Sequence, residues 1–296
     1  MKVGLIDVDG HNFPNLALMK ISNHHRQQGD VVEFVNHLGC YDKVYKSKVF
    51  TFTQDINPLI KADEVVKGGT GYKLYNELFC DDTEPDYSLY PNYSHAYGFL
   101  TRGCIRRCPW CVVPKKEGNI RAYRDIETVL QGRKTAILLD NNVLASDFGI
   151  KQIEKIVDLK CKVDFNQGMD CRLVTDDIAK LLSKVKWIRN IRFACDTDSG
   201  IEHLKNALKK LNRNGIKNYK VFVYVLVTDV ESADRRCEIL KKLGVTPFAQ
   251  PFIDYENNIM PTKKQKRFAR YVNCPQIFKS TDWKNYTTYK LMSCQL

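Results

Sequence analysis

The pattern of apolar and polar positions predicts a chain in which short strands alternate with helices. Residues 2–8 form a first strand, and Pro14 opens a helix that Gly29 ends. Further apolar runs at 31–35 and 64–66 predict two more strands, and the glycines at 68–71 lead into a helical stretch that ends near residue 79. This alternation is typical of an α/β fold with a doubly wound, Rossmann-like parallel sheet.

The alternation resumes after a tyrosine- and proline-rich stretch at 81–97 that has no periodicity. Strands are predicted at 99–101, 136–139, 161–165, 191–195, 221–227 and 248–250, and helices at 126–130, 176–184, 201–214 and 232–243. We therefore expect a first domain over 1–80, a linker over 81–97, a second α/β domain over 98–255 and a C-terminal extension over 256–296. Trp283, Tyr286 and Tyr289 are expected to pack that extension onto the second domain.

Three cysteines lie close together on the loop after the strand at 99–101. Cys104, Cys108 and Cys111 have the spacing C-x3-C-x2-C. Thiolates are the usual ligands of iron-sulfur clusters, and three of them leave one iron of a four-iron cluster open. An open metal position is what a catalytic site needs. Zinc stays as an alternative, because eight of the eleven cysteines lie outside this loop and one of them could complete a closed site.

The segment 98–118, with Trp110 directly before the third cysteine, resembles the signature of the radical S-adenosylmethionine enzymes. The resemblance implies a 4Fe-4S cluster on the three cysteines and S-adenosylmethionine on its open iron, with Trp110 against the adenine. It also implies reductive cleavage to a 5′-deoxyadenosyl radical, which abstracts hydrogen from a substrate that the sequence does not identify. A partial (β/α)6 TIM barrel and a reductant protein of the flavodoxin or ferredoxin kind belong to the same expectation.

Polar residues follow the predicted strands, where barrels gather their reactive groups. By the resemblance, Asp140, Asn141 and Asn142 lie where the family contacts the amino group of S-adenosylmethionine, and we favour this role over the alternative that they only cap a helix or form a turn. Arg172 is suited to a carboxylate, and Gln167 or Asp170 to ribose hydroxyls, with a surface ion pair as the structural alternative. Later strand ends add the substrate-side candidates Asp196 and Gln250.

Residues after the cysteine loop point to one branch of this family. Pro114, Glu117 and Gly118 resemble a motif of members that methylthiolate RNA or ribosomal protein. The structural alternative is that Glu117 and Arg121 form a solvated pair in a turn. A tRNA methylthiotransferase needs three further cysteines in its N-terminal domain for a second cluster. Only Cys40 and Cys80 precede residue 98 here, which weakens that alternative.

The first domain resembles the cobalamin-binding domain that often precedes such a barrel. Asp9 and His11 lie where that family carries D-x-H-x-x-G, and Gly68 and Gly69 lie near its paired glycines. Pro14 occupies the position of the motif's glycine, so we favour a degenerate domain that binds no cobalamin. There Asp9 and His11 would contact substrate or cap the helix, while a cobalamin-dependent methyltransferase stays as the alternative.

Charge and cysteine content bear on partners and location. The net charge of +12 favours polyanions such as nucleic acid, and one basic cluster consists of Lys263, Lys264, Lys266, Arg267 and Arg270. Eleven cysteines without a secretory signal favour a reducing, cytoplasmic setting, and no apolar run predicts a membrane span. The competitor from another class is a zinc-dependent nucleic-acid-binding protein without catalysis.

Overall fold

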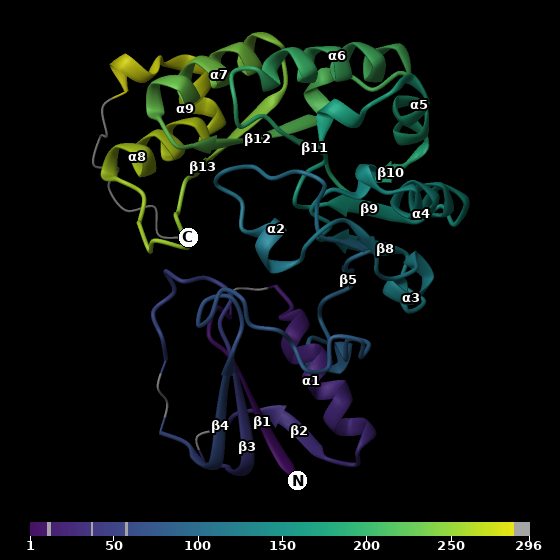
Figure 1. Ribbon diagram of the computed structural model, residues 1–296, viewed down its shortest axis with the longest axis vertical. Helices are drawn as coiled ribbons and strands as arrows, with labels where there is room; N and C mark the ends of the chain where they lie inside the picture. Colours follow the sequence, from purple (N-terminus) through teal and green to yellow (C-terminus); the bar gives the residue numbers. More distant parts are fainter. Residues whose placement is uncertain (11–12, 37, 57–58, 287–296) are drawn as a thin grey trace. The chain divides into compact units, whose positions relative to one another are not determined.

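The computed structural model describes residues 1–10, 13–36, 38–56 and 59–286. They form two compact units, Met1–Gly98 and Phe99–Leu296. Both units are α/β with parallel strands, as the sequence predicts (Figure 1). No helix within the described residues has the length and apolar character that a membrane span requires.

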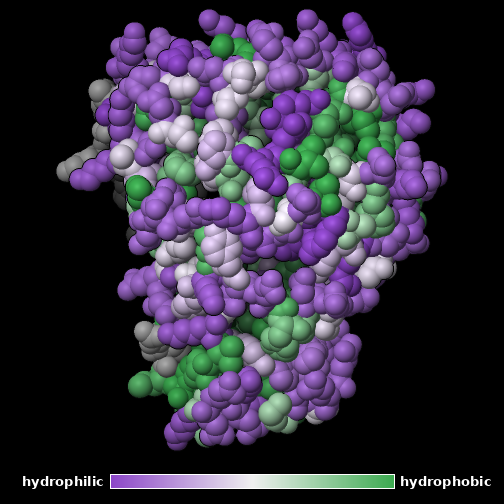
Figure 2. Space-filling view, in the orientation of Figure 1, coloured by the Kyte–Doolittle hydropathy of each residue, from purple (hydrophilic) through white to green (hydrophobic). Residues whose placement is uncertain are grey.

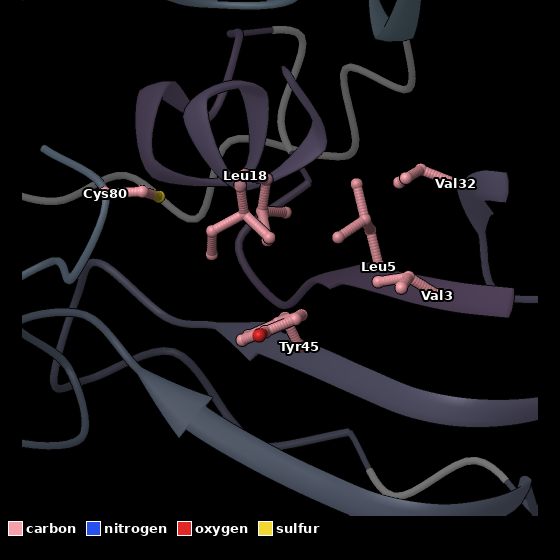
Figure 3. Packing of buried hydrophobic residues seen from close by; sticks show 7 residues of the cluster. Val3, Leu5, Leu18, Val32, Tyr45 and Cys80 are labelled. Carbon is pink, nitrogen blue, oxygen red and sulfur yellow. The ribbon is translucent and has the colours of Figure 1, made fainter. Parts of the chain in front are cut away.

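The first unit is built on a four-stranded parallel sheet with the order β2-β1-β3-β4. Its elements are β1 (Lys2–Asp7), α1 (Leu16–Gln27), β2 (Val31–Phe34), β3 (Cys40–Ser47) and β4 (Lys61–Gly68). Helix α1 packs on one face, where Leu5 and Leu18 meet Val32 and Tyr45 (Figure 3). A second cluster consists of Ile6, Val8, Tyr41 and Val44, with Ile60 and Tyr72 among the residues packed against it. The strand order reverses between β1 and β3, which is where open α/β sheets bind ligands.

Two predictions for this unit are wrong. No helix follows the glycines at 68–71, because the chain there turns back onto the end of β3: the Gly71 N–H donates to the Lys48 carbonyl at 2.9 Å. Gly69 has φ of +94°, and a Cβ on it would lie 2.3 Å from the same carbonyl oxygen. Within the described residues of this unit, α1 is therefore the only α-helix beside the sheet, where a doubly wound fold would have helices on both faces. The prediction also missed β3, since its lysines and Asp42 interrupt the apolar alternation.

The stretch 81–97, expected to be a linker, belongs to the first unit. It contains the short 3₁₀ helix η1 (Tyr87–Leu89) and leads into β5 (Ala96–Gly98). Asp86 accepts from the Ser22 hydroxyl at 2.6 Å, and the Tyr90 hydroxyl donates to Asp7 at 3.1 Å. These bonds tie the stretch to α1 and to the end of β1.

The second unit contains two three-strand runs of parallel strands. They are β10-β9-β8, with β8 (Thr135–Leu138), β9 (Lys162–Phe165) and β10 (Lys186–Trp187), and β11-β12-β13, with β11 (Ile191–Ala194), β12 (Val221–Val227) and β13 (Thr246–Pro251). A parallel bridge between Met169 and Phe193 links the two runs. The chain thus supplies β8, β9, β11, β12 and β13 in order across the unit (Figure 1).

Helices lie along the outer side of these strands (Figure 1). They are α3 (Ile126–Leu130), α4 (Asp147–Asp158), α5 (Asp176–Lys184), α6 (Gly200–Arg213), α7 (Val230–Lys242), α8 (Lys263–Val272) and α9 (Pro275–Ser280). Alternate strand residues are fully buried, as in Val221, Val223 and Val225 of β12. Hydrophilic side chains cover most of the visible face of the protein (Figure 2).

The predicted strands and helices of this unit are confirmed within two residues, apart from its first strand. In place of a strand at 99–101, β5 ends at Gly98, and Thr101–Arg102 forms β6, which pairs with β7 (Arg121–Ala122) in antiparallel fashion. The prediction also lacked α4, α8 and α9. Trp283 and Tyr286 pack on Tyr271, with ring centroids 5.5 and 5.2 Å away, whereas Tyr289 lies outside the described residues.

Candidate active site

The three-cysteine loop lies between β6 and the short helix α2 (Val113–Lys116). Cys104, Cys108 and Cys111 are free and partly exposed, unlike the buried Cys171 and Cys195. The Cys104 sulfur accepts two hydrogen bonds, one from the backbone N–H of Arg106 at 3.3 Å and one from Asn142 Nδ2 at 3.5 Å. These two donors fix the position of the first sulfur of the loop.

The start of the loop depends on a glycine. Gly103 has φ of +80°, in the left-handed region that side chains disfavour, and a Cβ there would lie 2.2 Å from the Asn119 carbonyl oxygen. The next residue, Cys104, donates its N–H to the Gly118 carbonyl at 3.2 Å. The two ends of the loop are therefore held against each other by close backbone contact.

We expect Gly103→Ala to reduce cluster loading at least tenfold while the rest of the unit stays folded. The added methyl group cannot fit without separating the loop ends, at a cost of a few kcal/mol from overpacking and the strained φ. Bound iron per chain after reconstitution, with circular dichroism for the fold, measures the effect. Gly215→Ala is the matched control, because Gly215 also has a positive φ but no atom near its added Cβ. Equal loading of the two variants would contradict this role of Gly103.

Asp140 follows β8 and fixes the segment that leads into the cysteine loop. Its side chain is buried, with 1% exposure, and accepts from the backbone N–H groups of Leu100 and Thr101 at 3.1 and 2.6 Å and from the Thr101 hydroxyl at 2.7 Å. Burial raises the pKa of Asp140 to about 6, against the lowering effect of these donors. Both oxygens are thus occupied by the chain itself. The contacts make Asp140 a positioning residue for the loop.

Glu117 binds the far side of the loop. One of its oxygens accepts from the Gly103 N–H at 3.0 Å and from Asn141 Nδ2 at 2.9 Å, and the other pairs with Arg102 at 3.0 Å. Its side chain is only 11% exposed, so the alternative of a solvated pair with Arg121 is wrong. The burial of this acid could not be seen in its polar sequence surroundings.

Asn142 lies beside the first cysteine. Its amide nitrogen donates to Cys104, while its oxygen Oδ1 is buried and has no hydrogen-bond partner within the described residues. A buried acceptor without a donor is uncommon in proteins and costs free energy unless a ligand supplies the donor. The amino group of a bound amino acid would be such a donor.

Asp170, the N-cap of the 3₁₀ helix η3 (Cys171–Leu173) after β9, binds an arginine of the cysteine loop. Asp170 accepts from Arg172 Nε at 2.6 Å and from Arg106 Nε at 2.8 Å, and its side chain is 6% exposed. Burial opposes ionisation, yet the two guanidinium groups hold the pKa of Asp170 below its usual value. Arg172 also acts electrostatically on Cys108. Sequence reasoning missed Arg106, although its place between two of the cysteines was a usable signal.

Asp196 lies two residues after the end of β11. It accepts from the Leu226 N–H at 2.9 Å, and burial raises its pKa. Its charge influences both Cys108 and Cys111, whose pKa values burial also raises. Trp110 is partly buried, whereas Gln167 and Gln250 are exposed. The structure thus brings the cysteines together with Asn142, Arg172 and Asp196.

The candidates in the first unit have structural partners. Asp9 is buried and accepts from the Val49 N–H, from the Phe50 N–H at 3.4 Å and from the Thr53 hydroxyl at 2.6 Å. Gly68 accepts from the Lys48 N–H at 3.0 Å, and Gly69 provides the close approach described above. These contacts shape the segment after β3. His11 lies outside the described residues.

We expect Asp9→Ala to destabilise the first unit by about 2–3 kcal/mol, because it leaves two backbone donors and a hydroxyl without their acceptor. Chemical denaturation of the full chain measures the change. Asp42→Ala is the comparison variant, because the Asp42 carboxylate accepts a single backbone N–H, that of Lys2. The loss of stability in Asp42→Ala should be smaller than in Asp9→Ala. Equal effects of the two substitutions would show that Asp9 does not organise the segment after β3.

The donor set fits an iron-sulfur cluster. It offers three free, solvent-accessible thiols on one short loop, and electrostatic interactions couple Cys108 and Cys111 to each other and to Cys104. Within the described residues, no group of three or more His, Cys, Asp or Glu side chains is arranged to hold a single metal ion. A multi-iron cluster presents a separate iron to each thiolate, so it does not require the sulfurs to converge on one point.

Comparison with known proteins adds a distant likeness. No family model matches the chain. It is 25% identical over 200 residues to the ribosomal protein uS12 methylthiotransferase RimO of a Nitratiruptor species, which covers 60% of this chain and 44% of that protein. It is 26% identical over 166 residues to the RimO of Caldanaerobacter subterraneus subsp. tengcongensis, covering 53% of this chain and 35% of that protein. The chain is similar to these methylthiotransferases. It spans less than half of their length.

Proposed function

We propose that this protein is a radical S-adenosylmethionine enzyme that acts on a substrate still to be identified. The observation that carries the proposal is the loop of three accessible thiols, whose ends are fixed by Gly103 and Glu117 and whose preceding segment is held by Asp140 from the carboxyl end of β8. The likeness to curated methylthiotransferases supports the same superfamily and supports enzymatic activity. The strands β8 to β13, in their sequential order, suit the partial barrel proposed for residues 98–255.

The roles of the chain's own residues follow from their contacts. Cys104, Cys108 and Cys111 would hold a 4Fe-4S cluster, with Asn142 donating to the first sulfur. Bound together, the cluster and S-adenosylmethionine supply reductive cleavage of a carbon–sulfur bond and, from it, hydrogen abstraction. Asn142 Oδ1 is proposed as the acceptor for an amino group, and Arg172 as the cation for a carboxylate. Trp110 is proposed to lie against the adenine.

Asp170 keeps the arginines beside the cysteine loop in place. Asp170 holds Arg172 and Arg106 at hydrogen-bond distance, so neither guanidinium can swing freely over the loop. Because Asp170 stays ionised, Arg172 keeps a fixed orientation with part of its fork still exposed. Asp196, which is partly buried and acts electrostatically on Cys108 and Cys111, is proposed to face the substrate.

Methylthiolation is the second candidate reaction, and the likeness to RimO favours it. The cysteine content of the first unit does not follow that pattern. Before residue 98 the chain carries Cys40, which is exposed, and Cys80, which is buried with a pKa raised by burial to about 11, so three thiols for a second cluster are not present there. We therefore propose methylthiolation of a tRNA or a ribosomal protein as the second candidate, after a radical reaction that needs the single cluster.

The test is reconstitution of the full chain with iron and sulfide under anaerobic conditions. The proposal expects a brown protein with about four irons per chain. It also expects the electron paramagnetic resonance spectrum of the reduced protein to change when S-adenosylmethionine is added. S-adenosylhomocysteine is the comparison ligand. A colourless protein that takes up one zinc would support the zinc-dependent alternative and contradict the proposal.

A further inference from the structure

Helix α8 carries an exposed stripe of positive charge. Lys263, Lys266, Arg267 and Arg270 are spaced i, i+3, i+4 and i+7, which places them on one face, and all four are exposed. The opposite face is buried in the unit. The helix contains no acidic residue. Within the described part of the chain, the side chains of Lys263, Lys266 and Arg270 form no ion pair, so their charge is available to a partner.

A cavity of about 480 Å³ adjoins this stripe. Arg267 belongs to both, because its guanidinium lies 5.4 Å from the ring centre of Trp283 and 5.5 Å from that of Tyr286, which line the cavity. The remaining lining residues are all charged: Glu231, Asp234, Arg235, Lys264 and Lys284. Trp283 is partly exposed and Tyr286 buried, so the tryptophan ring offers the accessible aromatic surface.

This combination matches the chemistry of a nucleotide strand. The cations of the α8 stripe suit a row of phosphates, and an aromatic ring beside an arginine suits an unpaired base. The carboxylates of Glu231 and Asp234 disfavour a purely anionic occupant of the cavity, whereas the amino groups of a base can donate to them. A membrane surface would meet no exposed apolar residue on α8.

We propose that α8 and the cavity beside it bind a single-stranded nucleic acid. Phosphates lie along Lys263, Lys266 and Arg270, and one base enters the cavity against Trp283. The cluster loop has no part in this binding. The inference goes beyond the proposed function, and its failure would leave the iron chemistry untouched.

Binding of fluorescein-labelled 12-nucleotide strands to the full chain, measured by fluorescence anisotropy across a salt series, tests the proposal. The triple variant Lys263→Gln, Lys266→Gln, Arg270→Gln removes three phosphate contacts. At about 0.7 counterions per contact for single strands, it should lower the salt slope by about 2 and weaken binding roughly ten- to hundredfold near 0.1 M salt. Strands of RNA and DNA with one sequence show which sugar is preferred.

The matched control is Lys209→Gln, Arg213→Gln, Lys217→Gln, which removes the same charges from exposed positions on and after α6. It should retain nearly the wild-type affinity. Equal weakening by both triple variants would reduce the effect to net charge and overturn the proposal. Two further results would also overturn it. One is that no strand binds at low salt. The other is that the α8 variant loses binding to anionic phosphatidylglycerol vesicles but keeps its binding to the strands.

Stacking on Trp283 is tested separately by quenching of intrinsic fluorescence with unlabelled strands. Trp283→Phe keeps an aromatic ring in the packed cluster, so the fold should survive, but the quenching should disappear. Trp187→Phe is the control, because Trp187 packs on Phe165 and donates to the Leu182 carbonyl at 3.2 Å, away from the cavity. Quenching that persists in Trp283→Phe would show that no base reaches this ring.

Discussion

Replacing Cys108 by alanine should remove nearly all iron from the reconstituted protein. A cluster held by three protein thiolates keeps only two after this change, and the described residues offer no ready substitute beside the loop: Cys171 and Cys195 are buried, and burial raises the pKa of each thiol to about 12. A thiol with such a pKa does not supply the thiolate that iron requires. We expect iron per chain to fall at least tenfold. Iron and acid-labile sulfide analysis after desalting gives the measurement.

The control for this substitution is Cys40→Ala. Cys40 is an exposed free cysteine at the start of β3, in the other unit, and its removal should leave iron content within error of the wild type. Circular dichroism of both variants separates loss of the cluster from loss of the fold. If Cys108→Ala retains its iron, or if Cys40→Ala loses it equally, the cluster is not held by the loop that we describe.

Asp140→Ala should be the most damaging single change to stability in the second unit. The carboxylate satisfies the N–H groups of Leu100 and Thr101 and the Thr101 hydroxyl in a site with no access to water. Leaving buried donors unsatisfied costs about 1–3 kcal/mol each, so a loss of about 3–5 kcal/mol in the free energy of unfolding is expected. Urea denaturation measures it. Asp158→Ala, at the exposed end of α4, should change stability by no more than about 0.5 kcal/mol.

The pH dependence gives an independent view of the same residue. Because burial raises the pKa of Asp140 from 3.8 to about 6, the folded state binds a proton more tightly than the unfolded state. This contribution therefore favours folding below pH 4 and is lost as pH rises through 6, by an amount on the order of 3 kcal/mol. The difference in stability between wild type and Asp140→Asn should shrink by about that much from pH 4 to pH 7. A constant difference would contradict the assignment.

The sequence predicted most of the second unit because its local signals agree with its tertiary structure. The uninterrupted apolar run of β12 and the capped start of α5, where Thr175 accepts from the Ile178 N–H, can be read without knowledge of their neighbours. The three cysteines were identified in the same way, by spacing. Local signals failed for β3, where Asp42, Lys43 and Lys46 interrupt the apolar positions and Lys46 is itself buried.

The contacts that hold the candidate site could not be predicted, since they join residues distant in sequence. Asp140 reaches Leu100 across forty positions, and Arg106 reaches Asp170 across sixty-four. A polar residue after a strand is expected to cap a helix or form a turn, and only the tertiary structure shows that Glu117 is buried beside Gly103. The cavity beside Trp283 likewise forms only where α7 and α8 meet residues 283–286.

The central claim is most directly tested by the formation of 5′-deoxyadenosine. The reconstituted full chain is incubated anaerobically with dithionite and S-adenosylmethionine, and the product is quantified by liquid chromatography and mass spectrometry beside Cys108→Ala. Our account predicts 5′-deoxyadenosine from the wild type and at most background from the variant. Iron-loaded wild type that forms no more than Cys108→Ala, whether or not candidate substrates are added, would contradict it.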